Sequence, residues 1–162
     1  MKKILWLAVA LGLCAAPVWA AVTPNSVVTA QTPSRGVVQF LQGTDTAGTY
    51  KTLYTAGTNG SKITGMFATS GDTAAAHLIT CQIVNTAVKY GGVAVNVPLN
   101  SGMATGVPPV NLMNTANWPG LPLDGNGNPY FTLVSGDTLQ CTYATALTAA
   151  TFANVVAVAA DY

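Results

Sequence analysis

The feature of this sequence that most constrains its fold is a series of short runs in which apolar and polar residues alternate. Alternation with a period of two places successive side chains on opposite faces of a strand, whereas helical periodicity is nearly absent. Turn-forming residues, among them Pro33, Gly43, Gly60, Gly71 and Gly91, separate the runs. The runs are Ser26–Ala30, Gly36–Leu41, Thr49–Thr55, Lys62–Thr69, His77–Val84, Gly92–Leu99, Tyr130–Val134, Thr138–Tyr143 and Thr151–Ala159. Eight or nine short strands at this spacing predict an all-β fold, an antiparallel β-sandwich or jelly roll.

Two of these runs, Tyr130–Val134 and Thr138–Tyr143, lie on either side of the turn residues Ser135–Asp137. Gly and Asp accept the positive φ that tight turns need, so the pattern predicts a β-hairpin. Elsewhere, Ala74–Ala76 and Val110–Ala116 have room for a single helical turn each.

One long irregular segment, Asn100–Asn128, is rich in proline and glycine. A connection of this length in a compact domain is usually functional, or is an ordered loop packed by its own side chains. We expect its apolar residues to anchor it, namely Leu112, Met113, Trp118, Leu121 and Leu123. An exposed Trp118 beside Tyr130 would instead favour ligand contact, because sugars stack on aromatic faces.

The first twenty residues have the pattern of a secretory signal peptide. A basic start at Lys2–Lys3 precedes the apolar run Ile4–Ala16, and Val18–Ala20 supplies the small residues of a cleavage site. The apolar run is shorter than the roughly 20 residues of a membrane-spanning helix. A lipid anchor on Cys14 is the less favoured alternative, because a bulky leucine precedes that cysteine.

Cleavage before Ala21 leaves 142 residues (162 − 20), which we expect to form one domain over 21–162. Only 7% of the residues of the chain are charged, against about 25% in an ordinary soluble domain. No basic patch is present, so nucleic acid is not an expected partner, and after signal cleavage neither is a membrane. A weakly charged, threonine-rich surface is poorly protected against self-association and suits a protein that assembles or coats something.

Two cysteines, Cys81 and Cys141, remain after signal cleavage, each within a strand-like run. An even count in an exported chain predicts a disulfide bond between them. The alternative is a pair of buried free thiols that pack as small apolar side chains.

No residue pattern in this chain indicates catalysis. His77 is the single histidine, and we expect it to be a half-exposed polar residue at the start of a strand. Asp45, Asp72 and Asp137 lie in or beside turns, where their side chains can accept hydrogen bonds from the backbone. We therefore expect no catalytic residues, no metal site and no cofactor.

Asp124–Asn128 begins like the calcium-binding loop of an EF-hand, but Pro129 replaces the required glycine and Ser135 the closing glutamate. A segment rich in Gly and Asn forms a turn without any metal, and we predict a plain turn here.

Several segments resemble small phage and prophage structural proteins. They are Thr23–Phe40, Thr52–Ile63, Trp118–Pro122, Pro129–Tyr130 and Ser135–Leu139, and together they span most of the mature chain. The resemblance implies a β-sandwich on a virion surface, such as a capsid-decorating or tail-associated subunit. With the signal peptide, it implies an exported surface or filament subunit.

We therefore expect a secreted, extracellular or periplasmic structural protein that forms a homo-oligomer or a surface assembly. The alternatives are a monomeric module that binds carbohydrate through the Asn100–Asn128 loop and, least favoured, an enzyme. An N-terminal arm poor in apolar side chains could pair with the sheet edge of a neighbouring copy, or form a first strand in its own sheet. The arm residues are Val22, Thr23, Pro24, Asn25, Ser26, Val27 and Val28.

Overall fold

The computed structural model describes residues 32–148 and 151–162, and within these ranges strands are the only regular secondary structure. The predicted signal peptide, the strand Ser26–Ala30 and the arm residues Val22–Val28 lie outside the described residues. The strands are β1 (Thr32–Leu41), β2 (Lys51–Thr55), β3 (Ser61–Ser70), β4 (His77–Asn85), β5 (Val88–Val97), β6 (Val110–Asn111), β7 (Phe131–Leu133), β8 (Asp137–Tyr143) and β9 (Phe152–Asp161).

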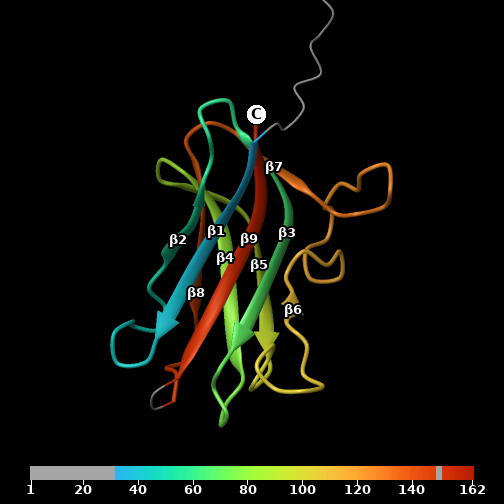
Figure 1. Cartoon of the computed structure of the whole chain (residues 1–162). Coiled ribbons are helices and arrows are strands. Elements are labelled where there is room, and N and C mark those ends of the chain that lie inside the picture. The colour runs from blue at the N-terminus through green and yellow to red at the C-terminus, as the bar shows by residue number, and fades with distance from the viewer. Residues whose placement is uncertain (1–31, 149–150) are drawn as a thin grey trace, which may run out of the picture.

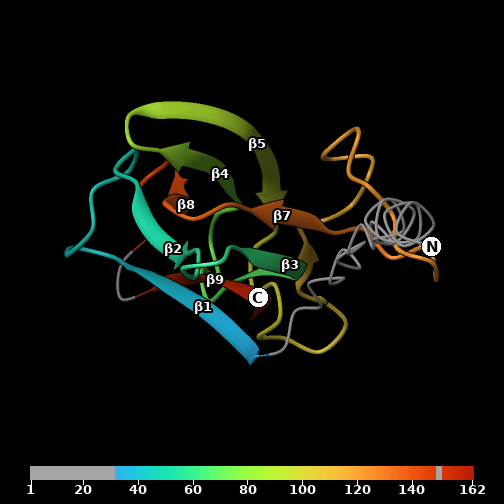
Figure 2. The same ribbon diagram turned by 90° about the horizontal axis from the view of Figure 1, so that it is seen from above.

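The strands form two antiparallel sheets that stack face to face (Figures 1 and 2). One sheet has the order β1-β9-β3, with β6 and β7 both paired to the outer edge of β3. The other has the order β2-β8-β4-β5. Pairing is nested, because β1 pairs with β9, β2 with β8, β3 with β7 and β4 with β5. A long hairpin folded over in this way is a jelly roll, so the predicted fold class is confirmed.

Alternation along the strands builds the core. In β4 the side chains of Ile79, Cys81 and Ile83 point inward and are buried, while the residues between them are partly exposed. The two sheets meet through ring contacts such as that of Phe40 on β1 with Tyr143 on β8, whose centroids are 5.0 Å apart. Other large, fully buried side chains are Ile63, Met66, Leu112, Met113, Leu133 and Leu139.

The structure contradicts the expected hairpin at Ser135–Asp137. β7 and β8 belong to different sheets, so the turn between them carries the chain from one layer to the other. The Asp137 N–H donates to the Val134 carbonyl (3.0 Å), and Gly136 has a φ of 88°. Ser135 has no positive φ, as in a type II turn, whose twist splays the flanking strands instead of pairing them.

Gly91, an expected turn residue, lies within a strand. The chain reverses earlier, between the paired residues Asn85 and Val88, with Thr86 at a φ of 55°. Gly91 is the extra residue of a β-bulge at a φ of 65°. β5 as a whole is strongly curved (Figure 2).

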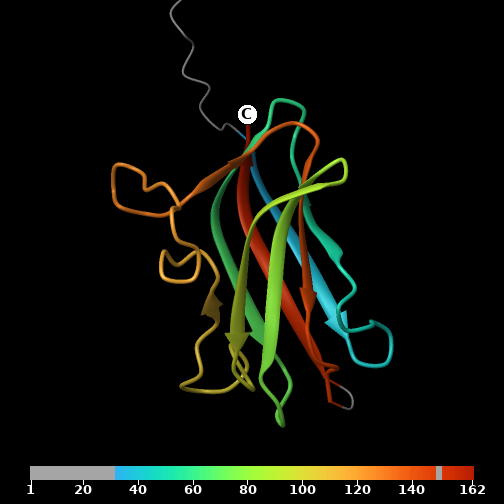
Figure 3. The ribbon, with the colours of Figure 1, turned by 180° about the vertical axis from the view of Figure 1, so that it is seen from behind.

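The segment between β5 and β7 runs along one side of the sandwich (Figure 3), and hydrogen bonds join it to β3. The Leu112 N–H donates to the Met66 carbonyl (2.9 Å), and the Ser70 N–H donates to the Ser101 carbonyl (2.9 Å). Val110–Asn111 is strand β6, so the helical turn predicted for Val110–Ala116 does not begin there. A single turn begins later, where the Trp118 N–H donates to the Asn114 carbonyl (2.8 Å). Of the five expected anchors, Leu112, Met113 and Leu121 are buried and Trp118 is half-buried, but Leu123 is 54% exposed and does not anchor the loop.

Candidate functional site

Cys81 and Cys141 form a disulfide bond, which confirms the predicted pair. The two residues lie directly opposite each other on β4 and β8, and both are fully buried on the core side of the sheet. The bond therefore joins the two central strands of one sheet rather than the two layers of the sandwich.

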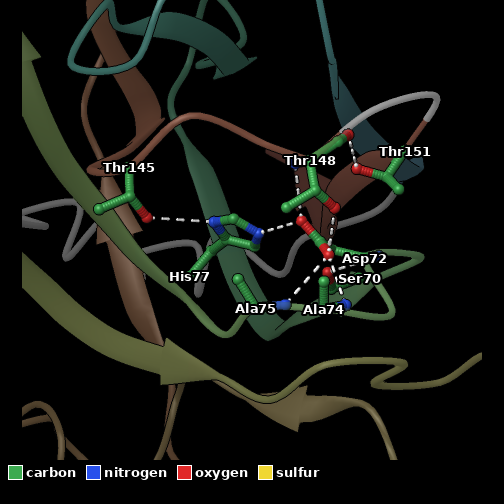
Figure 4. Close-up of polar contacts among 8 residues, drawn as sticks. All are labelled: Ser70, Asp72, Ala74, Ala75, His77, Thr145, Thr148 and Thr151. Atoms are coloured by element: carbon green, nitrogen blue, oxygen red, sulfur yellow. Dashed lines mark hydrogen bonds and ion pairs between the residues drawn. The ribbon is translucent and has the colours of Figure 1, made fainter.

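The most extensive buried polar cluster lies at the start of β4 (Figure 4). Nε2 of His77 lies 2.7 Å from Oδ2 of Asp72, and Nδ1 of His77 lies 3.2 Å from Oγ1 of Thr145. The side chains of His77 and Asp72 have no exposed surface. The expectation of a half-exposed histidine is therefore wrong.

Asp72 is the centre of this cluster (Figure 4). Its Oδ1 accepts hydrogen bonds from the N–H groups of Ala74 and Ala75 and from the Thr148 hydroxyl, and its Oδ2 accepts the Thr148 N–H. Burial alone would raise the pKa of Asp72, but the bonds from Thr148, Ala74 and His77 outweigh it and hold the pKa well below its usual range. The carboxylate thus ties the loop before β4 to the loop before β9.

Asp72, His77 and Thr145 have the order carboxylate, imidazole, hydroxyl that is found in nucleophilic triads. A catalytic base must reach a proton of the substrate, whereas the side chain of His77 is fully enclosed by protein. We therefore interpret the cluster as a polar tie that stabilises one end of the sandwich.

A second buried aspartate, Asp137, lies beside the other end of β4, where it pairs with Asn85. Its carboxylate accepts bonds from the Val134 N–H (2.8 Å), the Asn85 side-chain amide (2.7 Å) and the Tyr90 hydroxyl. Burial of Tyr90 and the hydrogen bond from its hydroxyl to the ionised Asp137 carboxylate raise the pKa of Tyr90 to about 12. Asp45 accepts the Leu41 N–H (2.8 Å), so all three aspartates expected to bond to turn backbone do so.

Asp124 organises the loop that resembles a calcium site. Its Oδ1 accepts the N–H groups of Asn126 (2.9 Å) and Asn128 (2.8 Å), as in an Asx-type turn. The described residues contain no group of three or more His, Cys, Asp or Glu side chains placed to hold a metal ion.

We expect calcium at millimolar concentration to leave the melting temperature unchanged and to release no heat in a calorimetric titration. A ligand that binds only the folded state must stabilise it, and one carboxylate whose Oδ1 already accepts two amides is a poor calcium site. A rise of several degrees with calcium but not with magnesium would contradict this prediction.

The structure does not bring Trp118 and Tyr130 together as one aromatic surface. Trp118 is half-buried and packs against Phe131, with ring centroids 5.0 Å apart. Tyr130 has the Lys62 ammonium 4.2 Å from the centre of its ring. The two aromatic residues thus have different neighbours, and Tyr130 lines a depression between β3 and the loop before β7 that does not include Trp118.

The outer face of the β1-β9-β3 sheet carries an apolar row that spans all three strands. Val37 pairs with Val156, and Val156 pairs with Phe67, so the three side chains lie side by side on one face. Val37 is 56% exposed, Phe67 36% and the neighbouring Val158 43%. We refer to Val37, Val156, Phe67 and Val158 as the apolar face.

In the part of the chain that the structure describes, β1 pairs only with β9 and is therefore an edge strand. Its last residues are covered on the other side, because the Lys51 ammonium donates to the Gln39 carbonyl (2.8 Å) and the Leu41 N–H donates to Asp45. A lysine on a sheet edge opposes pairing with another strand.

None of the described segments is a helix long and apolar enough to cross a membrane. The chain matches no protein-family profile, and a search of curated proteins finds no relative in sequence. Its fold has a likeness to a chain of the "Cyanophage Pam1 capsid asymmetric unit", with a TM-score of 0.43 and 17% identity over 81% of this chain and 84% of that chain. That structure is a phage capsid, but at this TM-score and identity the likeness is no basis for assigning a function.

Proposed function

We propose that this protein is an exported, non-enzymatic structural subunit that assembles with copies of itself or decorates a surface. The observation that carries the proposal is the apolar face, where three aligned side chains on three strands expose hydrophobic surface to solvent. Contiguous exposed apolar patches on soluble proteins usually mark interaction sites.

The composition supports the same proposal. With 7% charged residues, little electrostatic repulsion opposes the approach of a second copy. Arg35 lies on the same face as Val37, one row away, paired with Val158. A mostly apolar face with a charge at its border has the composition of a protein interface, with a hydrophobic centre and a polar rim.

Export is supported by the predicted signal peptide and by the buried disulfide bond, because disulfides persist in oxidising compartments. A jelly roll is compatible with a structural role, but it also occurs in lectin domains, so the fold alone does not select the function.

The predicted arm Val22–Val28 is the proposed second contact between subunits. It ends three residues before edge strand β1, so an extended arm would leave the domain from the sheet that carries the apolar face. Extended segments can add a strand to the sheet of a neighbour, where main-chain hydrogen bonds supply the affinity.

A double substitution, Val37→Lys with Phe67→Lys, should abolish higher-order species of the exported protein, because two charges then occupy the centre of the contact. Light scattering and electron microscopy of natively exported material measure the loss. The matched control is Leu78→Lys with Val88→Lys, which changes two exposed apolar residues of the other sheet, 41% and 66% exposed.

The control pair should assemble like the wild type.

Deletion of Ala21–Ala30, which removes the arm, should leave a folded, disulfide-bonded monomer. Unchanged assembly of the Val37 and Phe67 variant would contradict the role of the apolar face, and a wild-type protein that is monomeric at all concentrations would contradict self-assembly.

A further inference from the structure

A groove runs along the surface between strand β3, strand β6 and the loop that leads into β7. Its first part has a volume of about 290 Å³ and is lined by polar side chains that include Thr64, Asn111, Asp124 and Asn128, together with Tyr130. A second part, of about 260 Å³, shares Asn111 with the first and continues along the loop. Together the two parts have the size of a small-molecule site.

The wall that carries Asp124 is held in one conformation. The Asp124 N–H donates to the Asn128 carbonyl (2.9 Å), and Leu123 and Pro129 form a β-bridge. Asp124 Oδ1 is committed to the two backbone amides of its turn, whereas Oδ2 has the Asn128 side-chain amide at a long 3.3 Å. Since a carboxylate oxygen has two acceptor sites, Oδ2 has the capacity to accept from a ligand.

The opposite wall comes from an irregularity in β3. Ile63 pairs with Ala159 and Gly65 with Val158, so Thr64 is the extra residue of a bulge. The bulge turns the exposed Thr64 toward the groove, and Gly65 beside it adds no side chain. Bulges of this kind often re-aim a side chain at a functional position.

The groove contains one carboxylate and has one ammonium group next to it. The Lys62 ammonium lies 4.2 Å from the centre of the Tyr130 ring. The pKa of Asp124 is lowered mainly by the hydrogen bond from the Asn128 N–H, and the positive charge of Lys62 lowers it further. An anionic ligand would meet the ionised Asp124, and a cationic ligand would meet Lys62. The electrostatics therefore favour a neutral ligand.

We propose that this groove binds a neutral saccharide. Vicinal hydroxyl groups both donate and accept, which matches an acceptor at Asp124 and amides at Asn111 and Asn128 that can do both. The C–H face of a sugar ring requires an apolar partner, which the half-buried Tyr130 ring provides.

Trp118 is not part of this site. It packs on Phe131 and does not line either part of the groove. The saccharide site therefore differs from the aromatic pair expected from the sequence, because Tyr130 contributes and Trp118 does not.

Saturation-transfer NMR on the mature chain, residues 21–162, tests the proposal. The probes are the methyl glycosides of glucose, galactose, mannose and N-acetylglucosamine at millimolar concentration. At least one should receive saturation, and its dissociation constant should rise at least about tenfold in Asp124→Asn and in Tyr130→Ala, a change that corresponds to about 1.4 kcal/mol. Asn at position 124 retains an oxygen for the turn but removes the charge.

Trp118→Phe and Asn96→Ala, the latter an exposed residue on β5, are the matched controls and should bind like the wild type. Absence of transfer from all four glycosides would overturn the proposal, as would equal transfer in the Asp124→Asn and wild-type proteins. Neither Val37 nor Phe67 lines the groove, so the Val37→Lys and Phe67→Lys variant should retain binding.

Discussion

Replacing Asp72 with alanine should lower the free energy of unfolding by about 3 to 5 kcal/mol, the usual cost of breaking a buried polar pair. The substitution leaves the fully enclosed imidazole of His77 without its partner at Nε2. It also removes the acceptor of four hydrogen bonds from Ala74, Ala75 and Thr148. Urea unfolding followed by tryptophan fluorescence measures the loss.

Asp72→Asn should retain only part of this stability. Oδ2 accepts both the Thr148 N–H and His77 Nε2, so an amide NH₂ at that position would face two donors. Asp124→Ala is the matched control, since Asp124 also accepts two backbone N–H groups, but on an exposed loop, and the change there should be small. Equal stability of Asp72→Ala and the wild type would contradict the assigned role.

Asp72→Ala should also change how the free energy of unfolding depends on pH. The pKa of Asp72 in the folded protein lies below its ordinary value of about 3.9. Its contribution is therefore fully present above about pH 4 and is lost as the pH falls toward the folded-state pKa. The difference in unfolding free energy between the wild type and Asp72→Ala should therefore shrink as the pH falls below about 4.

The strands were predictable from the sequence because their signal is local. Eight of the nine predicted runs lie in the described residues, and each overlaps an observed strand, since alternation of polar and apolar residues reports one buried face. The order of the strands could not be read in this way. Pairing of β1 with β9 depends on residues more than a hundred positions apart, which no local pattern encodes.

The turn at Ser135–Asp137 illustrates the limit of local reasoning. Its residue types suit a tight turn, and the structure has one there, but residue type does not distinguish a turn that pairs its strands from one that crosses between sheets. That outcome is decided by the partners of β7 and β8, which are β3 on one side and β2 and β4 on the other.

The buried His77 cluster and the groove beside Thr64 were not predicted, because both depend on contacts between segments that are far apart in the sequence. His77 follows Asp72 by five residues, a spacing that could have suggested contact. The other members of the cluster, Thr145 and Thr148, are distant in sequence and reach it only in the folded chain. The long loop was recognised as unusual from its proline and glycine content, whereas the groove needs the bulge at Thr64 on a distant strand.

Removing the disulfide bond with Cys81→Ala and Cys141→Ala should lower the free energy of unfolding by about 4 kcal/mol. The bond closes a loop of 60 residues, and in the chain-entropy model a cross-link of this length strongly restricts the unfolded state. Alanine at both positions avoids placing a buried hydroxyl in the core, because both cysteines are fully buried. Urea unfolding of the mature chain, residues 21–162, in wild-type and variant form measures the difference.

Peptide mapping without reductant should first recover one linked pair, Cys81 with Cys141, and no free thiol. The variant should still fold, because β4 and β8 remain paired without the disulfide bond. Their backbone pairing covers Ile79–Asn85 on β4 and Asp137–Tyr143 on β8. Because the cross-link acts mainly on the unfolded chain, the variant should behave like the wild type in the assembly and saccharide-binding experiments proposed above. Free thiol on both residues of exported protein, or equal urea midpoints for the two proteins, would show that the bond does not stabilise this fold.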